Sequence, residues 1–195
     1  QNGSRSLRVE ITSYTGGDAK WYFNPVNVNP NTTYSFSDYY QSNVNTQVLA
    51  QYTATNGTVR YVWLKTALPS NTWNLISVSF QTPANVRSVS IFHLLALKGF
   101  LITDNFSLSQ DSGIPTVTPT ATPAVTPSIT VSPTPTATPT PSATPTPAPV
   151  VNLIPNPSLE TVNPANINRP LYWQSQKYGS NTTTFSYLTT GRTGG

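Results

Sequence analysis

A run of 35 residues, Pro115 to Pro149, limits most strongly how this chain can fold. It contains 11 prolines and 15 threonines or serines, and no charged residue stands between Asp111 and Glu160. Proline fixes φ at an extended value, lacks a backbone donor and pushes the preceding residue toward the extended region. The run therefore predicts an extended, polyproline-II-like Thr/Pro linker over 112–149, which separates residues 1–111 from residues 150–195.

Composition indicates a secreted protein. Charged residues make up 8% of the chain and aromatic residues 11%, whereas about 25% of an ordinary soluble domain is charged. The net charge of +4 comes from scattered Lys and Arg, so we expect no nucleic-acid partner. The longest apolar run, 91–102, is interrupted by His93 and Lys98 and is too short to span a membrane. We therefore expect an extracellular or cell-surface location.

Alternating apolar and polar residues predict an all-β fold. Asn56-Gly57 is a strong hairpin signal, Pro25 favours a sheet edge or a bulge, and no stretch has a helical period. Short strands separated by turn residues are typical of an antiparallel sandwich. The expected strands cover 6–11, 20–28, 33–40, 46–53, 59–66, 73–80, 86–95, 100–108, 171–178 and 182–189.

Several spaced motifs resemble those of carbohydrate-binding modules of the family 4/9 type, within the galactose-binding-like jelly rolls. The opening strand of these modules resembles N-L-I-P-N-P-S-L-E at 152–160, followed by Trp173 and the turn at 191–195. Their later strands resemble 6–9, 33–40, 73–80 and 99–108. The chain thus has the family's motifs in rotated order, and the resemblance implies a jelly-roll β-sandwich.

This rotation predicts that one sandwich is shared between successive units. Residues 1–111 would be the larger, C-terminal part of a sandwich, and residues 150–195 would be the N-terminal strands of the next. A neighbouring repeat of one long polypeptide, or a separate subunit acting as a strand donor, would complete each sandwich. Both arrangements are head-to-tail assemblies that form filaments, and we favour the covalent repeat. The residues expected to be buried by strand completion are Leu153, Ile154, Leu159 and Trp173.

Two functions are compatible with this organisation. The first is the structural repeat unit of an extracellular, glycosylated filament or fibril, in which the partners are copies of the chain itself. The alternative is a secreted carbohydrate-binding module with its linker, from a modular glycoside hydrolase or adhesin, whose partner is a polysaccharide. We do not expect an enzyme, because the six acidic residues are scattered and the single histidine, His93, lies among apolar neighbours.

Candidate ligand-binding residues follow from side-chain chemistry and from the resemblance. Sugar rings stack on exposed aromatic side chains, and the candidates are Trp21, Tyr22, Tyr39, Tyr40, Tyr61 and Trp63. The resemblance also implies a structural calcium ion held by Glu160 and Asp104. Asn105 stands where relatives carry a second Asp. We expect no other cofactor.

Covalent glycans are a further expectation, because Thr- and Ser-rich segments with Pro are typical O-glycosylated stalks. The O-glycosylation candidates are Thr116, Thr118, Thr120, Thr122, Thr126, Thr134, Thr136, Thr138, Thr140, Thr144 and Thr146. N-glycosylation sequons occur at Asn2, Asn31, Asn56, Asn105 and Asn181.

Overall fold

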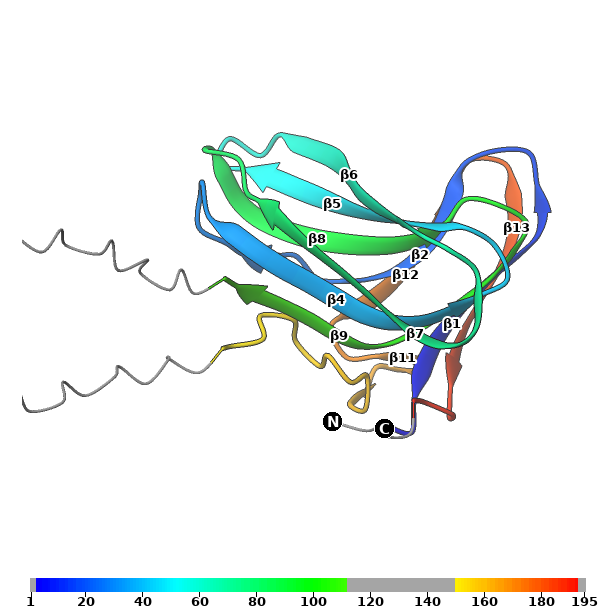
Figure 1. Ribbon diagram of the computed structural model, residues 1–195. Coiled ribbons are helices and arrows are strands. Elements are labelled where there is room, and N and C mark those ends of the chain that lie inside the picture. The colour runs from blue at the N-terminus through cyan, green and yellow to red at the C-terminus, as the bar shows by residue number, and fades with distance from the viewer. Residues whose placement is uncertain (1–2, 112–149, 193–195) are drawn as a thin grey trace, which may run out of the picture. The chain divides into compact units, whose positions relative to one another are not determined.

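The computed structural model describes residues 3–111 and 150–192 (Figure 1). The predicted Thr/Pro linker, its O-glycosylation candidates and Asn2 lie outside the described residues. The described part is an all-β sandwich, as the sequence predicts. No helix in it is long and apolar enough to cross a membrane.

Two antiparallel sheets form the sandwich (Figure 1). The first has five strands, in the order β13 (Asn181–Leu188), β1 (Ser6–Tyr14), β9 (Gly99–Gln110), β4 (Thr33–Ser42) and β7 (Ser70–Gln81). The second has the order β12 (Trp173–Tyr178), β2 (Asp18–Phe23), β8 (Val86–Leu95), β5 (Thr46–Ala54) and β6 (Val59–Ala67), and β3 (Val26–Asn27) also pairs with β8. A small separate sheet pairs β10 (Val162–Asn163) with β11 (Asn166–Pro170).

The turn residues act as the sequence predicts. Strands β5 and β6 form a hairpin, and Gly57 adopts a φ of 86° between them, a value that glycine tolerates without a steric penalty. Pro25 separates β2 from β3, because proline cannot donate to a sheet ladder. The sequence analysis missed β10 and β11, which are short, polar and without apolar alternation.

The core lies between the inner faces of the two sheets. Leu7, Val9 and Ile11 alternate along β1 and are each at most 2% exposed. Trp173 packs edge-on against Phe23 and lies 4.5 Å, between ring centroids, from Phe106. This aromatic contact links the C-terminal strands to both halves of the sandwich, and burial of such rings stabilises a fold strongly.

Residues 150–192 complete the sandwich of their own chain, which differs from the expectation that they enter the next one. Strand β13 pairs along β1, and β12 pairs along β2. Of the four residues expected at the junction, Leu153 is half-buried, and Ile154, Leu159 and Trp173 are buried. The physical reason is that one chain supplies both parts of a single sandwich, so its own tail can cover the edges of β1 and β2.

Two carboxylates fix the start and the end of the described chain, one at each end. Glu160 accepts hydrogen bonds from the backbone N–H of Arg5 (3.0 Å) and the hydroxyl of Ser4 (2.9 Å). Asp104 accepts one from the backbone N–H of Arg192 (2.8 Å). Gly191 packs so closely that an added Cβ would lie 2.6 Å from the Arg5 nitrogen. The rotated motif order requires this contact between tail and head.

Candidate functional site

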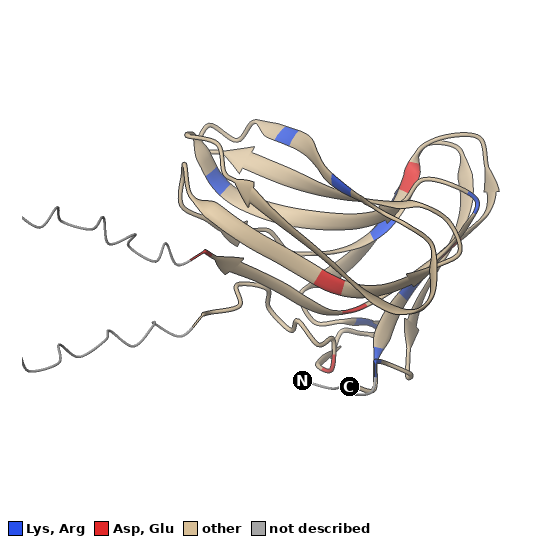
Figure 2. Ribbon diagram, viewed as in Figure 1, with Lys and Arg blue, Asp and Glu red and all other residues tan. Residues whose placement is uncertain are grey.

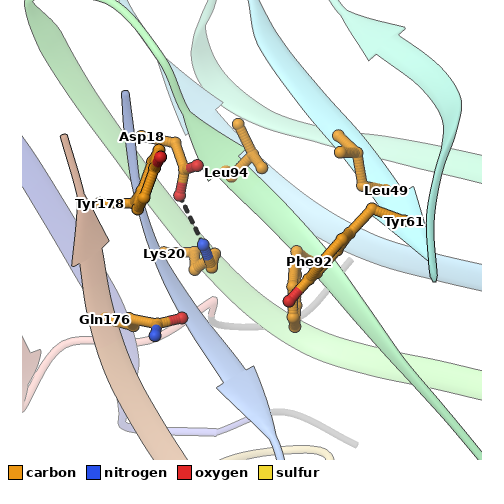
Figure 3. Close-up of a pocket in the computed structure, with 8 residues that line it drawn as sticks. All are labelled: Asp18, Lys20, Leu49, Tyr61, Phe92, Leu94, Gln176 and Tyr178. Atoms are coloured by element: carbon orange, nitrogen blue, oxygen red, sulfur yellow. Dashed lines mark hydrogen bonds and ion pairs between the residues drawn. The ribbon is translucent and has the colours of Figure 1, made fainter. Parts of the chain in front are cut away.

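A groove of about 310 Å³ lies on the outer face of the β12-β2-β8-β5-β6 sheet (Figure 3). Its wall is built by alternate side chains of five strands, which point away from the core. The lining residues are Asp18, Lys20, Leu49, Tyr61, Phe92, Leu94, Gln176 and Tyr178. Because side chains alternate between the two faces of a strand, these residues follow directly from the sheet register.

The register extends this face beyond the groove itself. Lys20 pairs with Gln176 on β12 and with Leu94 on β8. Leu49 pairs with Trp63 on β6, so the Trp63 side chain lies on the same face. Trp63 and Tyr61 are 58% and 57% exposed. The edge strand β6 therefore presents two large aromatic rings to solvent.

Aromatic rings form the apolar side of the groove. The Phe92 ring is buried beneath two tyrosines: its centroid lies 6.1 Å from that of Tyr61 and 5.3 Å from that of Tyr22. The Tyr22 hydroxyl donates to Gln174 Oε1 at 3.2 Å, and burial raises the pKa of this hydroxyl. Rings with an apolar face and a polar edge suit a ligand that has both kinds of surface, such as a sugar.

Polar groups stand opposite the rings. Lys20 Nζ donates to Asp18 Oδ1 at 2.5 Å and lies 5.0 Å from the Phe92 ring centroid (Figure 3). Gln51 Nε2 donates to the Tyr61 hydroxyl at 3.0 Å. The ammonium group of Lys20 is therefore neutralised by its neighbour, and the groove offers a mixture of donors and acceptors without a large net charge.

The structure divides the six predicted aromatic residues into three groups. Tyr22, Tyr61 and Trp63 lie on the face that carries the groove, as described above. Trp21 and Tyr40 point into the core, where Trp21 Nε1 donates to the Arg8 carbonyl at 3.0 Å. The proposal of sugar contact is thus wrong for these two, because strand alternation turns them inward.

Tyr39 is the sixth predicted aromatic residue, and it does not join the groove. It lies on β4, in the other sheet, with the Arg192 guanidinium carbon 3.7 Å from its ring centroid. Its ring therefore contacts the end of the described chain, on a different surface from the groove.

Sequence reasoning missed several groove residues. Phe92 and Leu94 lie on β8, where nearly every side chain is buried, so alternation gives no signal for which face each residue occupies. Tyr178 and Gln176 lie on β12, where only the first residue, Trp173, is buried and the other five are exposed. The strand therefore has no alternation that would show which face each side chain occupies. The pairing of β12 with β2 places them in the groove, and this pairing links residues far apart in the chain.

The acidic residues are few and spread over several strands and turns of the described chain (Figure 2). Glycoside hydrolysis requires two carboxyl groups that face each other across the sugar. Among the described residues that line the groove, Asp18 is the only acid, and it forms an ion pair with Lys20. His93 is buried between the sheets and contacts Asp38 and Thr46, so it does not reach the groove.

The predicted calcium ligands are engaged by hydrogen-bond donors. Both oxygens of Glu160 accept bonds from Ser4 and Arg5, and both oxygens of Asp104 accept backbone N–H groups, from Asn105 and Arg192. The described residues include no group of three acidic, His or Cys side chains that could hold a metal. Calcium takes six to eight oxygen ligands, so backbone carbonyls would have to complete the shell beside Glu160 and Asp104, and the calcium site stays a prediction.

Burial raises the pKa of the Asp104 carboxyl to about 6, against the two backbone N–H groups that lower it. The nearby Glu160 carboxylate raises this pKa further. Glu160 and Asp104 therefore anchor the two ends of the described chain. The surroundings of the Asp104 carboxyl group disfavour its charged form.

The described sequons differ in exposure. Asn31 and Asn56 are exposed in turns. The Asn105 Nδ2 atom, to which a glycan would attach, is buried. The Asn181 Nδ2 atom donates to the carbonyls of Gly16 and Tyr178. Asn31 and Asn56 are thus the described sequons whose side chains are accessible for modification.

Comparison with solved structures assigns the fold. The structure named "PbXyn10C CBM APO" matches over 94% of this chain and 87% of its own length, with 12% identity and a TM-score of 0.55. The "CBM22-1 xylan-binding domain from Paenibacillus barcinonensis Xyn10C" matches over 54% of this chain and 71% of its own, with 14% identity and a TM-score of 0.41. No family model and no curated protein matches the sequence. The chain therefore has the β-sandwich fold of carbohydrate-binding modules.

Proposed function

We propose that this chain is an extracellular carbohydrate-binding module that holds a polysaccharide in the groove of the β12-β2-β8-β5-β6 sheet. The observation that carries the proposal is the gathering of Tyr22, Tyr61, Phe92 and Trp63 on one open face. Such a face is a good platform for the apolar faces of sugar rings, because aromatic rings bury a large apolar area.

Binding in this groove requires no chemical step. The rings of Tyr61 and Trp63 stack on the sugar, and Gln51, Gln176 and the Lys20–Asp18 pair supply hydrogen bonds to hydroxyl groups. The groove has one acid and no facing partner for it among its described residues. We therefore propose that the module binds polysaccharide and leaves cleavage to another domain or protein.

Titration calorimetry against soluble polysaccharides tests the proposal. We expect measurable binding to at least one of xylan, mixed-linkage β-glucan and galactomannan. Substitution Tyr61→Ala should weaken that binding about tenfold, because it removes an exposed stacking ring. Leu75→Ala is a matched control, because Leu75 is 50% exposed on β7 of the other sheet. Equal loss of affinity in both variants, or binding to none of the three polymers, would contradict the proposal.

A second candidate function is head-to-tail assembly into a filament, and one observation favours it. Leu153 N–H donates to the Leu108 carbonyl at 2.7 Å, so the described chain ends and resumes beside the same strand on either side of 112–149. A segment of this Thr-Pro composition favours extended backbone, and extended backbone would hold its two ends apart, whereas the described ends meet at β9. A neighbouring copy could accept residues 150–195 of this chain, and the two ends of 112–149 would then not need to lie side by side.

Light scattering on the purified chain tests this second candidate. Exchange of residues 150–195 between copies predicts particles whose mass grows with concentration. A rearranged chain, with 150–195 placed directly before 1–111, should stay monomeric because each copy closes itself. A wild-type chain that remains a monomer of 21.1 kDa at all concentrations would contradict exchange between separate subunits.

A further inference from the structure

A separate pocket of about 220 Å³ lies at one end of the sandwich, where β5 ends and where β6 and β8 begin. Its lining residues are Tyr52, Ala54, Asn56, Thr58, Arg60, Pro83, Asn85 and Val86. None of them lines the groove described above. The Thr55 N–H donates to the Asn85 carbonyl at 2.9 Å, and this bond joins the β5–β6 turn to the turn before β8. The pocket therefore has its own rim, built from two connected turns.

The hydroxyl group of Tyr52 is open to a ligand in this pocket. Tyr52 is only 4% exposed, and its ring packs against Phe80 with 6.2 Å between the ring centroids. No described residue forms a hydrogen bond with its hydroxyl. The unpartnered side-chain atoms that the described protein encloses fully belong to Asn105 and Arg169, so the Tyr52 oxygen keeps an accessible surface. A polar group in such a place gains from a ligand that supplies a partner.

Arg60 places a positive charge beside that hydroxyl. It lies directly opposite Tyr52 in the β5–β6 pairing, so the two side chains project from the same face. Burial raises the pKa of the Tyr52 hydroxyl to about 12, and the charge of Arg60 opposes this rise. Arg60 is exposed, and the ion pairs among the described residues use Arg8, Lys20 and His93 instead. No acid is among the described residues that line the pocket.

Neutral groups complete the wall of the pocket. Asn56 and Asn85 provide exposed side-chain amides, and Pro83 and Val86 provide an apolar side. The Thr58 N–H donates to Asn56 Oδ1 at 3.0 Å, which fixes the orientation of that amide. The cavity is smaller than the about 300–1,000 Å³ of pockets for drug-sized ligands. It therefore suits one small ring with polar substituents and not a length of polymer.

We propose that this pocket binds a single acidic sugar residue, a uronic acid, through its carboxylate. The guanidinium group of Arg60 and the hydroxyl of Tyr52 donate to the carboxylate oxygens. The amides of Asn56 and Asn85 bind hydroxyl groups of the ring, and the apolar side of the pocket covers its C–H groups. The site shares no residue with the groove, so this inference goes beyond the proposed polysaccharide binding and does not rest on it.

The test is an NMR titration of the whole chain, produced without N-glycans because Asn56 belongs to a sequon. The three probes are methyl β-glucuronoside, methyl β-glucoside and acetate, at about 0.15 M salt to screen general attraction to a basic protein. We expect the glucuronoside to shift the backbone amide signals of Thr58 and Asn85. It should bind at least about tenfold more tightly than the other two probes, because the glucoside lacks the charge and acetate lacks the ring.

Three variants assign the binding to the pocket. Arg60→Gln and Tyr52→Phe should each weaken glucuronoside binding about tenfold, and Tyr52→Phe keeps the ring that packs in the core. Lys98→Gln is the control, because it removes one positive charge from the exposed turn after β8. It should bind the glucuronoside as the wild type does. Thermal melts of each variant show whether a loss of affinity reflects a loss of folding.

Each contrary outcome overturns a stated part of the inference. Equal affinity for glucuronoside and glucoside would overturn recognition of the carboxylate, and equal affinity for glucuronoside and acetate would overturn recognition of a sugar. Binding that survives in Arg60→Gln, or is lost equally in Lys98→Gln, would overturn the assignment to this pocket. Tyr61→Ala, in the groove, should leave glucuronoside binding unchanged; a loss there would place the sugar in the groove. Polysaccharide binding in the groove is measured separately, so it can stand if this inference fails.

Discussion

His93 Nδ1 lies 2.9 Å from Asp38 Oδ2, and this contact joins the two sheets inside the core. Thr46 Oγ1 lies 2.7 Å from the other ring nitrogen of His93. Both members of the pair are almost fully buried. Burial raises the pKa of the Asp38 carboxyl, and the neighbouring His93 opposes this shift. The polar groups of the core are thus satisfied by one another, and their role is to fix how the sheets face each other.

The first prediction concerns the stability that this pair contributes. Asp38→Ala should lower the free energy of unfolding by about 3–5 kcal/mol, because it leaves a buried polar partner unsatisfied. Replacing both residues by Leu should cost much less than the sum of the single changes, since neither buried polar group then remains. Urea unfolding measures both effects. The control Ser37→Ala, on the outer face of β4, should change the value by less than about 0.5 kcal/mol.

The second prediction concerns pH. The folded pKa of Asp104 is about 6, above the ordinary value near 4. A raised pKa means that the neutral carboxyl is favoured in the folded state. Its contribution to stability is therefore fully present below about pH 4 and is lost as the pH rises through 6.

We expect the wild type to lose roughly 2–3 kcal/mol of stability from this group between pH 4 and pH 7. Asp104→Asn should remove this part of the pH dependence. Unfolding curves at a series of pH values, with and without chelator, measure it. The chelator tests the predicted calcium site: curves that coincide would show that the two acids hold no cation, and a large loss of stability on adding chelator would show that they hold one.

The third prediction tests the contact between the tail and the head. Gly191→Ala should destabilise the fold by about 1–3 kcal/mol, because an added Cβ would lie within 2.7 Å of backbone atoms of Gly3 and Arg5. Gly16→Ala is the matched control, since no atom lies within 4 Å of the position of its Cβ. Differential scanning calorimetry of the two variants should show a lower melting temperature for the first alone. Equal melting temperatures would mean that the tail does not pack against the head as described.

Local sequence signals were sufficient for the longer strands and for the hairpin turn, but not for β10 and β11. Alternation along Leu7, Val9 and Ile11, and the Asn56-Gly57 turn, depend only on neighbouring residues, and the structure contains the corresponding strands and hairpin. The candidate site depends instead on register between distant strands. Phe92 could not be assigned to the groove because the side chains on both faces of β8 are buried.

The sequence could not predict whether residues 150–195 pair with their own chain or with a neighbouring copy. The rotated motif order indicates that residues 150–195 and 1–111 belong to one kind of sandwich. The same order would result whether both parts come from one chain or from two neighbouring copies. In the structure the tail pairs with β1 and β2 of its own chain. A sheet edge accepts any strand of suitable sequence, so the choice between these partners depends on the intervening segment and on concentration.

Mapping of the bound polysaccharide on the protein surface tests the central claim most directly. Backbone amide signals recorded by NMR during titration with xylo- and gluco-oligosaccharides locate the contact. Our account predicts shifts centred on Lys20, Leu49, Tyr61, Phe92 and Gln176, with the outer face of the β13-β1-β9-β4-β7 sheet unaffected. Shifts centred on that opposite sheet, or none at saturating oligosaccharide, would contradict the account.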